Sequence, residues 1–215
     1  MKKCIVLAAF AMMATAISAF AQESVFNTAD FTYSPVTMKY KADGADVSTK
    51  YNAVSVNYDQ ARLLPVSLPL YVQYGAGLQY TWKTEKEGGL KDTDSFLTLK
   101  VPVSVLYQFE VPNVPLTIMP YAGLNLQAHL IGQNKVSYEG ESEKVSYFDK
   151  EAMSESFYGD TFNRFVVGWQ IGARFMYQDY FIGLSYNGPV TNLYKYSSDI
   201  KLRNSQFNIS VGLRF

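Results

Sequence analysis

The chain has 215 residues and a formal net charge of 0, and only 18% of its residues are charged. This balance argues against nucleic-acid binding, which requires a basic surface. A single cysteine, Cys4, excludes a disulfide framework. The length suits one domain, and the unusual feature is the aromatic content of 15%, with 17 tyrosines.

Residues 1–21 have the pattern of a cleaved secretory signal peptide. Met1, Lys2 and Lys3 form a basic start, and an uncharged apolar stretch follows over residues 5–17. This stretch is shorter than the roughly 20 residues that a membrane helix needs. Small residues in an A-x-A arrangement end at Ala21. We therefore predict cleavage after Ala21 and one mature domain over residues 22–215.

Apolar and polar residues alternate with a period of two through the rest of the chain, and helical periodicity is lacking. Most of the predicted strands exceed the roughly 5–6 residues usual in soluble sheets. They match the roughly 9–11 tilted residues with which a strand crosses a bilayer. Pro35 interrupts the first strand, which is the least regular. The eight predicted strands are 31–41, 49–60, 68–82, 95–108, 116–130, 163–177, 180–188 and 204–215.

Aromatic residues collect near both ends of the apolar faces. Amphipathic rings favour the two membrane–water interfaces, so two such levels are typical of a barrel that spans a bilayer. A soluble sandwich or lipocalin-like barrel also alternates, but it does not require paired aromatic levels. One level comprises Tyr58, Tyr107, Tyr177, Tyr180 and Phe215, and the other comprises Tyr40, Tyr80, Trp82, Phe165, Tyr186 and Phe207.

The connections between the predicted strands alternate in length. Short periplasmic turns and longer outer loops produce this alternation in outer-membrane barrels. With an even number of strands, both termini lie on the same side, which we predict to be the periplasm. The longer, polar connections are 41–48, 83–94, 131–162 and 189–203, and the shorter ones are 61–67, 109–115 and 178–179.

The last strand is strictly two-faced. Its apolar set consists of Phe207, Ile209, Val211, Leu213 and Phe215. Because lipid cannot satisfy a free sheet edge, such strands span a membrane only in a closed barrel. A slip of one residue would turn Arg214 toward lipid. We therefore predict an all-β protein, an eight-stranded antiparallel up-and-down transmembrane β-barrel.

This pattern resembles the small outer-membrane barrels of Gram-negative bacteria, the OmpA/OmpX-like group of the porin family. In that family an amphipathic last strand with a terminal aromatic residue is read by the barrel-assembly machinery. The resemblance implies that residues 207, 209, 211, 213 and 215 serve as this assembly signal. It also implies a location in the outer membrane, in contact with outer-membrane lipids and lipopolysaccharide.

The inward face is predicted to carry polar and charged groups. Eight strands enclose only enough room for side chains, so we expect a filled interior, with a narrow charge-selective pore as the alternative. Arg164 also falls on this face, and the basic residues of this face have few acids beside them. We expect the acids of the periplasmic rim to pair with Lys100, Arg174 or Arg214; these acids are Asp59, Glu110 and Asp179. The predicted interior residues are Lys39, Lys100, Gln127, His129, Gln170, Arg174 and Arg214.

No pattern predicts a catalytic centre, a cofactor or a metal site. His129 is the single histidine, which excludes a two-histidine metal site. A lipid-modifying barrel enzyme, the third functional alternative, would need a hydroxyl or acid beside His129. We predict instead a non-enzymatic envelope protein that acts through four outer loops. Loop 134–160, acidic and aromatic, is a possible contact for a surface partner.

Overall fold

The computed structural model describes residues 25–42, 45–138, 141–148, 162–194 and 200–215. The predicted signal peptide and part of loop 134–160 lie outside these residues. Within them, no helix is long and apolar enough to cross a membrane. The strands are β1 (Val25–Ala42), β2 (Ala45–Leu63), β3 (Leu70–Glu87), β4 (Leu90–Tyr107), β5 (Phe109–Glu110), β6 (Leu116–Tyr138), β7 (Glu141–Ser146), β8 (Phe165–Tyr177), β9 (Tyr180–Pro189) and β10 (Lys201–Arg214).

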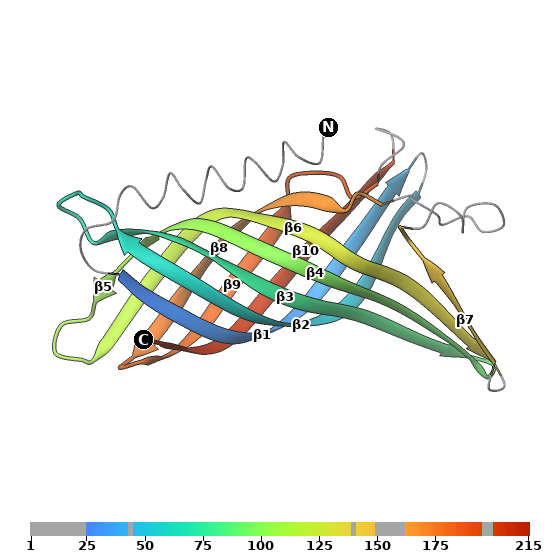
Figure 1. Ribbon diagram of the computed structural model, residues 1–215, viewed down its shortest axis with the longest axis horizontal. Helices are drawn as coiled ribbons and strands as arrows, with labels where there is room; N and C mark the ends of the chain where they lie inside the picture. Colours follow the sequence, from blue (N-terminus) through green and yellow to red (C-terminus); the bar gives the residue numbers. More distant parts are fainter. Residues whose placement is uncertain (1–24, 43–44, 139–140, 149–161, 195–199) are drawn as a thin grey trace.

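Eight long strands close into a barrel (Figure 1). Around the ring the order is β1, β2, β3, β4, β6, β8, β9 and β10, and every neighbouring pair is antiparallel. The short strands β5 and β7 pair only with β6. The predicted eight-stranded up-and-down barrel is confirmed, and each predicted strand overlaps one observed strand.

The two ends of the barrel differ. The turn end carries the connections 64–69, 111–115 and 178–179 together with Phe215, and lies at the left of Figure 1. The loop end lies opposite, where β3 and β4 are joined by Gly88 and Gly89. Both glycines have positive φ, 54° and 86°, which suits a tight two-residue hairpin because only glycine adopts it without strain.

At the loop end, the strands run further than the alternation predicts. β6 continues to Tyr138 and turns back as β7, so the first part of the predicted loop 134–160 is a β-hairpin. A bulge beside Leu97 and Thr98 shifts the register between β4 and β6. As a result, Leu130 and Ile131 both point outward, with exposed fractions of 46% and 51%.

The two faces of each strand have opposite surroundings. Outward apolar side chains such as Leu124, Ile182 and Val211 are about half exposed, whereas their inward neighbours are buried. Most of the predicted aromatic residues lie on the outward face at the two expected levels. Tyr40 is an exception, because it lines a cavity inside the loop end.

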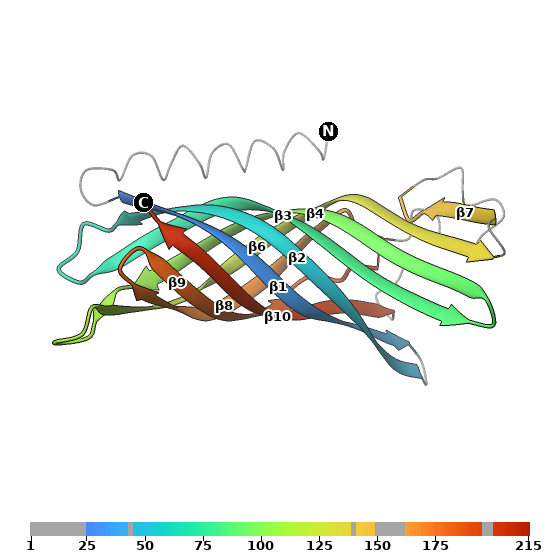
Figure 2. The same ribbon diagram turned by 90° about the horizontal axis from the view of Figure 1, so that it is seen from below.

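The barrel closes between β1 and β10, which lie side by side in Figure 2. The ladder is interrupted at Ser34 and Pro35, since proline has no N–H to donate. Within the gap, the Ser34 hydroxyl donates to Asn208 Oδ1 at 2.6 Å. At the turn end, Phe215 exchanges two backbone hydrogen bonds with Asn27, of 2.9 and 3.0 Å. The last residue is therefore part of the closing seam.

Candidate functional site

The candidate site is the barrel interior, which consists of three layers. At the turn end, an apolar layer fills the barrel, and its Leu106 and Met119 have exposed fractions of 0%. These side chains come from strands all around the ring, so they close this end of the interior. The buried members of the layer are Phe26, Ala61, Tyr71, Leu106, Met119, Met176 and Phe181.

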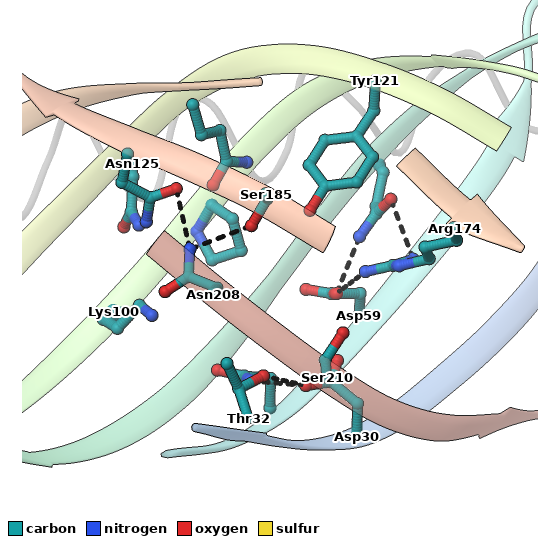
Figure 3. A pocket seen from close by; sticks show the side chains of 15 residues that line it. Asp30, Thr32, Asp59, Lys100, Tyr121, Asn125, Arg174, Ser185, Asn208 and Ser210 are labelled. Atoms are coloured by element: carbon teal, nitrogen blue, oxygen red, sulfur yellow. Dashed lines mark hydrogen bonds and ion pairs between the residues drawn. The ribbon is translucent and has the colours of Figure 1, made fainter. Parts of the chain in front are cut away.

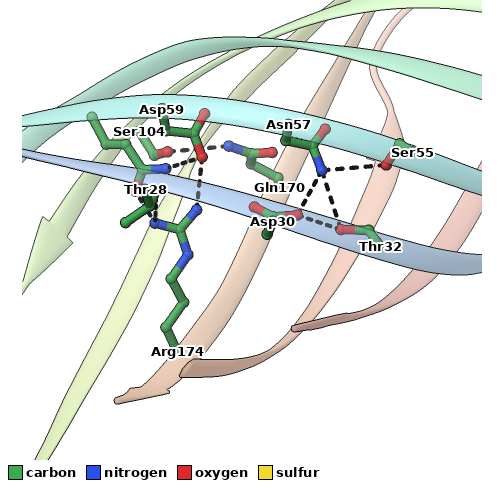
Figure 4. Close-up of polar contacts among 10 residues, drawn as sticks. Thr28, Asp30, Thr32, Ser55, Asn57, Asp59, Ser104, Gln170 and Arg174 are labelled. Atoms are coloured by element: carbon green, nitrogen blue, oxygen red, sulfur yellow. Dashed lines mark hydrogen bonds and ion pairs between the residues drawn. The ribbon is translucent and has the colours of Figure 1, made fainter. Parts of the chain in front are cut away.

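Above this layer lies a polar belt built around an ion pair. Arg174 of β8 and Asp59 of β2 meet across the barrel, with Nη2 and Oδ2 2.8 Å apart (Figure 4). Gln73 donates to the same carboxylate oxygen at 2.7 Å and accepts from Arg174 at 3.1 Å. The guanidinium also lies over the rings of Tyr121 and Phe181. A buried ion pair needs such additional contacts to offset its loss of hydration.

A second acid, Asp30 of β1, continues the belt. Its carboxylate accepts hydrogen bonds of 2.7 Å from both Thr32 and Asn57. Asp30 and Asp59 balance the charges of Lys100 and Arg174. The prediction that few acids share the inward face was wrong, because the expected first strand began at residue 31 and so omitted Asp30.

Lys100 faces a small cavity inside the belt (Figure 3). Its side chain is 6% exposed, and the described residues give its ammonium no direct hydrogen bond or ion pair. The cavity has a volume of about 50 Å³, which is room for a few water molecules at roughly 10–15 Å³ each. Asp30, Asp59 and Asn125 also line it. The polar belt is thus largely filled by side chains.

The third layer, at the loop end, is aromatic. Phe96 and Tyr147 are stacked 5.3 Å apart between ring centroids, and Met38 is buried against them. Above these rings, a partly enclosed cavity of about 680 Å³ occupies the loop end. The three layers make this cavity blind at its inner end.

His129 lies on the inward face, as predicted, and is buried. Its Nδ1 is 2.8 Å from Thr98 Oγ1, and its ring packs near Phe96 and Phe148. Within the described part of the chain, Nε2 has no hydrogen-bond partner. No carboxylate or serine of the described residues contacts the ring, so the described interior assembles no acid–histidine pair around it.

The structure places the other predicted interior residues individually. Gln127 and Gln170 are buried in the belt, and Gln170 donates to Ser104 Oγ at 3.1 Å. Arg214 faces inward at the turn end, with its guanidinium 4.3 Å from the centroid of the Phe26 ring. Arg164 lies at the other rim, exposed, over the ring of Phe148. These positions bring Gln170 and Arg174 together with Lys100 around one cavity.

Lys39 is a correction, because the structure places it on the outward face. Buried residues in β1 are the even-numbered ones from Phe26 to Met38, so odd-numbered Lys39 points outward. Near residue 39 the alternation is inverted, because apolar Met38 and Tyr40 face the interior of the loop end while Lys39 faces outward. Lys39 belongs instead to an outward cluster, the basic seam, which comprises Lys39, Lys41, Lys201 and Arg203.

The basic seam crosses the closure of the barrel at the loop end. Lys39 is opposite Arg203, and Lys41 is opposite Lys201, in the β1–β10 ladder. These side chains surround a groove of about 240 Å³ that Tyr186 also lines. Among the described residues, Asp46 is the acid that pairs with the seam, at 2.8 Å from Lys41. Sequence spacing alone gives no sign of the seam, since its two halves lie at opposite ends of the chain.

The predicted assembly-signal residues of the last strand all face outward. Phe207, Ile209, Val211, Leu213 and Phe215 have exposed fractions between 43% and 61%. The ring of Phe215 lies 6.3 Å from that of Tyr58, within the aromatic level of the turn end. Recognition of these five residues by the barrel-assembly machinery stays a prediction.

Solved structures with a similar course of the chain are outer-membrane proteins. Ail of Yersinia pestis, solved with the heparin analogue sucrose octasulfate, is 14% identical with a TM-score of 0.48, covering 90% of this chain and 100% of Ail. Neisserial surface protein A is 13% identical with a TM-score of 0.40, at 90% and 100% coverage. The outer membrane enzyme PagL is 13% identical with a TM-score of 0.41, at 85% and 98% coverage. Likenesses at this level do not transfer an activity.

No curated protein matches the chain. The family model described as outer membrane protein beta-barrel domain matches residues 5–215, which is nearly the whole sequence. The match agrees with the closed ring of eight antiparallel strands and with its apolar outward face. The chain therefore belongs to the outer membrane protein beta-barrel domain family and is a transmembrane β-barrel of the Gram-negative outer membrane.

Proposed function

We propose that this barrel is a non-enzymatic envelope protein that is closed to diffusion and acts through its loop end. The observation that carries the proposal is the filled interior. An apolar layer with fully buried Leu106 and Met119 lies below a polar belt whose cavity holds only about 50 Å³. A porin-like path would need a continuous water column past Lys100 and Arg174.

Single-channel recording tests the closed interior. The mature protein, refolded and reconstituted in a planar bilayer, is expected to give no discrete conductance. The unheated gel shift of an intact barrel must first verify folding. As a positive control, Leu106→Gly with Met119→Gly removes two fully buried side chains of the apolar layer. Discrete conductance of the native barrel that changes on Lys100→Gln or Arg174→Gln would instead support a narrow charge-selective pore.

We further infer that the loop end faces outward from the cell and both termini face the periplasm. The basic seam supports this orientation, because it sits beside Tyr186 of the loop-end aromatic level. That level corresponds to the membrane–water interface. Cationic side chains there suit the phosphates of lipopolysaccharide, since Lys and Arg near an anionic membrane surface contribute about 1 kcal/mol each.

Lipopolysaccharide retention tests this contact. Lys39→Gln with Arg203→Gln removes one cross-strand basic pair of the seam. Losing two cations at about 1 kcal/mol each should weaken retention of lipopolysaccharide by the refolded barrel about thirtyfold, as measured by native mass spectrometry. The matched control is Lys86→Gln with Lys91→Gln, a cross-strand basic pair on β3 and β4 away from the groove. Equal losses in both variants would mean that net charge matters and that the seam is no site.

The β6–β7 hairpin is the part of the loop end that we propose for contact with a surface partner. It carries Glu141, Glu143 and Lys144 on a short strand that pairs only with β6. Within the described part of the chain, only its second strand lies off the closed ring, because β7 pairs with β6 alone. We also propose that the barrel-assembly machinery binds the last strand during biogenesis.

A further inference from the structure

The cavity at the loop end has the size and lining of a small-molecule site. Its volume of about 680 Å³ lies within the roughly 300–1,000 Å³ typical of ligand pockets. Six of its described lining side chains are aromatic and four are aliphatic or methionine, with four polar residues between them. The described lining residues are Met38, Tyr40, Thr49, Tyr51, Asp92, Asp94, Phe96, Asn134, Val136, Tyr147, Phe162, Tyr194, Ile200 and Leu202.

Aromatic rings from distant strands form the inner wall of this cavity. Phe96 and Tyr147 stack at 5.3 Å with an interplanar angle of 6°. Phe162 meets Tyr147 edge-on at 5.0 Å, and Tyr51 meets Phe96 edge-on at 6.5 Å. The rings hold one another in place, so the wall is formed before any ligand arrives. Such a wall offers both apolar area and the negative faces of π systems.

Two carboxylates lie at the edge of the aromatic wall. Asn134 Nδ2 bridges them, at 2.6 Å from Asp92 Oδ1 and 2.9 Å from Asp94 Oδ1. Tyr51 donates to Asp94 at 3.1 Å, and the Tyr147 hydroxyl donates to the same carboxylate. Burial and this contact raise the pKa of the Tyr147 phenol, so its hydroxyl remains a donor. The donors in these contacts, one amide and two phenol hydroxyls, are all neutral.

Among the described residues, no Lys, Arg or His forms an ion pair with Asp92 or Asp94, and none lines the cavity. Lys83 is directly opposite Asp94 in the β3–β4 ladder, but its ammonium pairs with Glu85 at 2.8 Å. Lys83 and Glu85 offset each other, so the charge of the two aspartates stays uncompensated. Two like charges held by a shared amide leave a negative potential that a bound cation would relieve.

We propose that the loop-end cavity binds an amphipathic organic cation, with its ammonium group at Asp92 and Asp94 and its apolar body against the aromatic wall. Ammonium groups bind the faces of aromatic rings as well as carboxylates. A neutral apolar molecule would leave the carboxylates uncompensated, and an inorganic cation would leave the aromatic wall unused. The combination of the two features therefore favours a cation with an apolar body.

Methionine methyl NMR tests the proposal directly. Met38 lies in the cavity wall, whereas Met119 and Met176 lie in the apolar layer of the turn end. The refolded barrel with ¹³C-labelled methionine methyl groups is titrated with 3-phenylpropylammonium. We expect a saturable shift of the Met38 signal, assigned through Met38→Leu, and unchanged signals from Met119 and Met176.

Charge is tested with the ligand and with the protein. The neutral analogue 3-phenylpropanol is expected to bind the native barrel about tenfold more weakly than 3-phenylpropylammonium does. The double variant Asp92→Asn with Asp94→Asn is likewise expected to bind 3-phenylpropylammonium about tenfold more weakly than the native barrel does. The matched control, Glu110→Gln with Asp179→Asn, removes the same charge at the exposed turn end and should bind as the native barrel does. Unchanged Met119 and Met176 signals show that each variant is folded.

Two outcomes would overturn the proposal. If the Met38 signal of a folded barrel stays constant throughout the titration, the cavity takes no such cation. Alternatively, 3-phenylpropanol and the cation bind equally well, or the control variant loses as much affinity as the aspartate variant. In that case the cavity selects apolar bodies without regard to charge.

Discussion

Asn208 and Ile209 are neighbours in β10 with opposite surroundings. Asn208 is 6% exposed and hydrogen-bonded to Ser34, Ser185 and Asn187 across three strands. Ile209 is 44% exposed and points away from the barrel. An inward side chain thus needs hydrogen-bond partners and must fit the available space. An outward side chain faces lipid and needs only to be uncharged. The same contrast runs through every strand of the ring.

The largest effect is expected where an inward charge loses its partner. Arg174→Met leaves the buried Asp59 carboxylate without its ion pair, and removing one member of a buried pair costs about 3–5 kcal/mol. Urea unfolding in lipid vesicles, followed through the fluorescence of Trp82 and Trp169, measures the loss. Adding Asp59→Asn should restore most of the stability. If the single and double variants unfold alike, the pair does not organise the belt.

A charge on the outward face is the converse test. Val211 lies on the outward face of β10, midway between Phe207 and Phe215 of the two aromatic levels. Val211→Arg is therefore expected to lower the free energy of unfolding by about 2–4 kcal/mol. The control is Val66→Arg, in the turn 64–69, where the side chain is 52% exposed outside the strands. Similar costs at both positions would mean that Val211 does not face lipid.

A smaller effect distinguishes two adjacent residues of β3. A Cβ on Gly75 would meet Asp59 Oδ1 and the Tyr58 carbonyl oxygen at overlapping distances. Gly75→Ala should therefore cost about 1–3 kcal/mol through overpacking. The outward neighbour Ala76 has free space, so Ala76→Val should change stability by less than about 0.5 kcal/mol. The same unfolding experiment compares them, and a reversed order would contradict the assignment of the faces.

Period-two alternation was sufficient to predict the ring of strands, because each strand has one face in lipid and one inside. It fails at the loop end, where apolar side chains such as Met38 and Tyr40 face the interior. There it places Lys39 on the wrong face and predicts a loop where β6 extends to Tyr138. Asp59 was named as a partner for Arg174, and the ion pair confirms it.

The loop-end cavity lay beyond sequence reasoning for a different reason. Tyr51, Asp94 and Tyr147 belong to separate strands or turns, and the pairing of β2, β3, β4 and β6 together with the return of β7 brings them into contact. The bulge beside Leu97 also resets which residues of β6 face inward. A one-residue shift of this kind leaves no mark in an alternating pattern. The basic seam likewise depends on pairing between the two ends of the chain.

The break in the ladder at Pro35 bears on how the barrel is sealed. It divides the contact between β1 and β10 into two short ladders, one from Thr28 to Tyr33 and one from Val36 to Lys41. Each ladder holds six residue pairs, and the hydrogen bond from Ser34 to Asn208 lies in the break between them. The middle of the seam is therefore held by a side-chain contact in place of backbone pairing, so Ser34 and Asn208 do there what the peptide groups do along the rest of the closure.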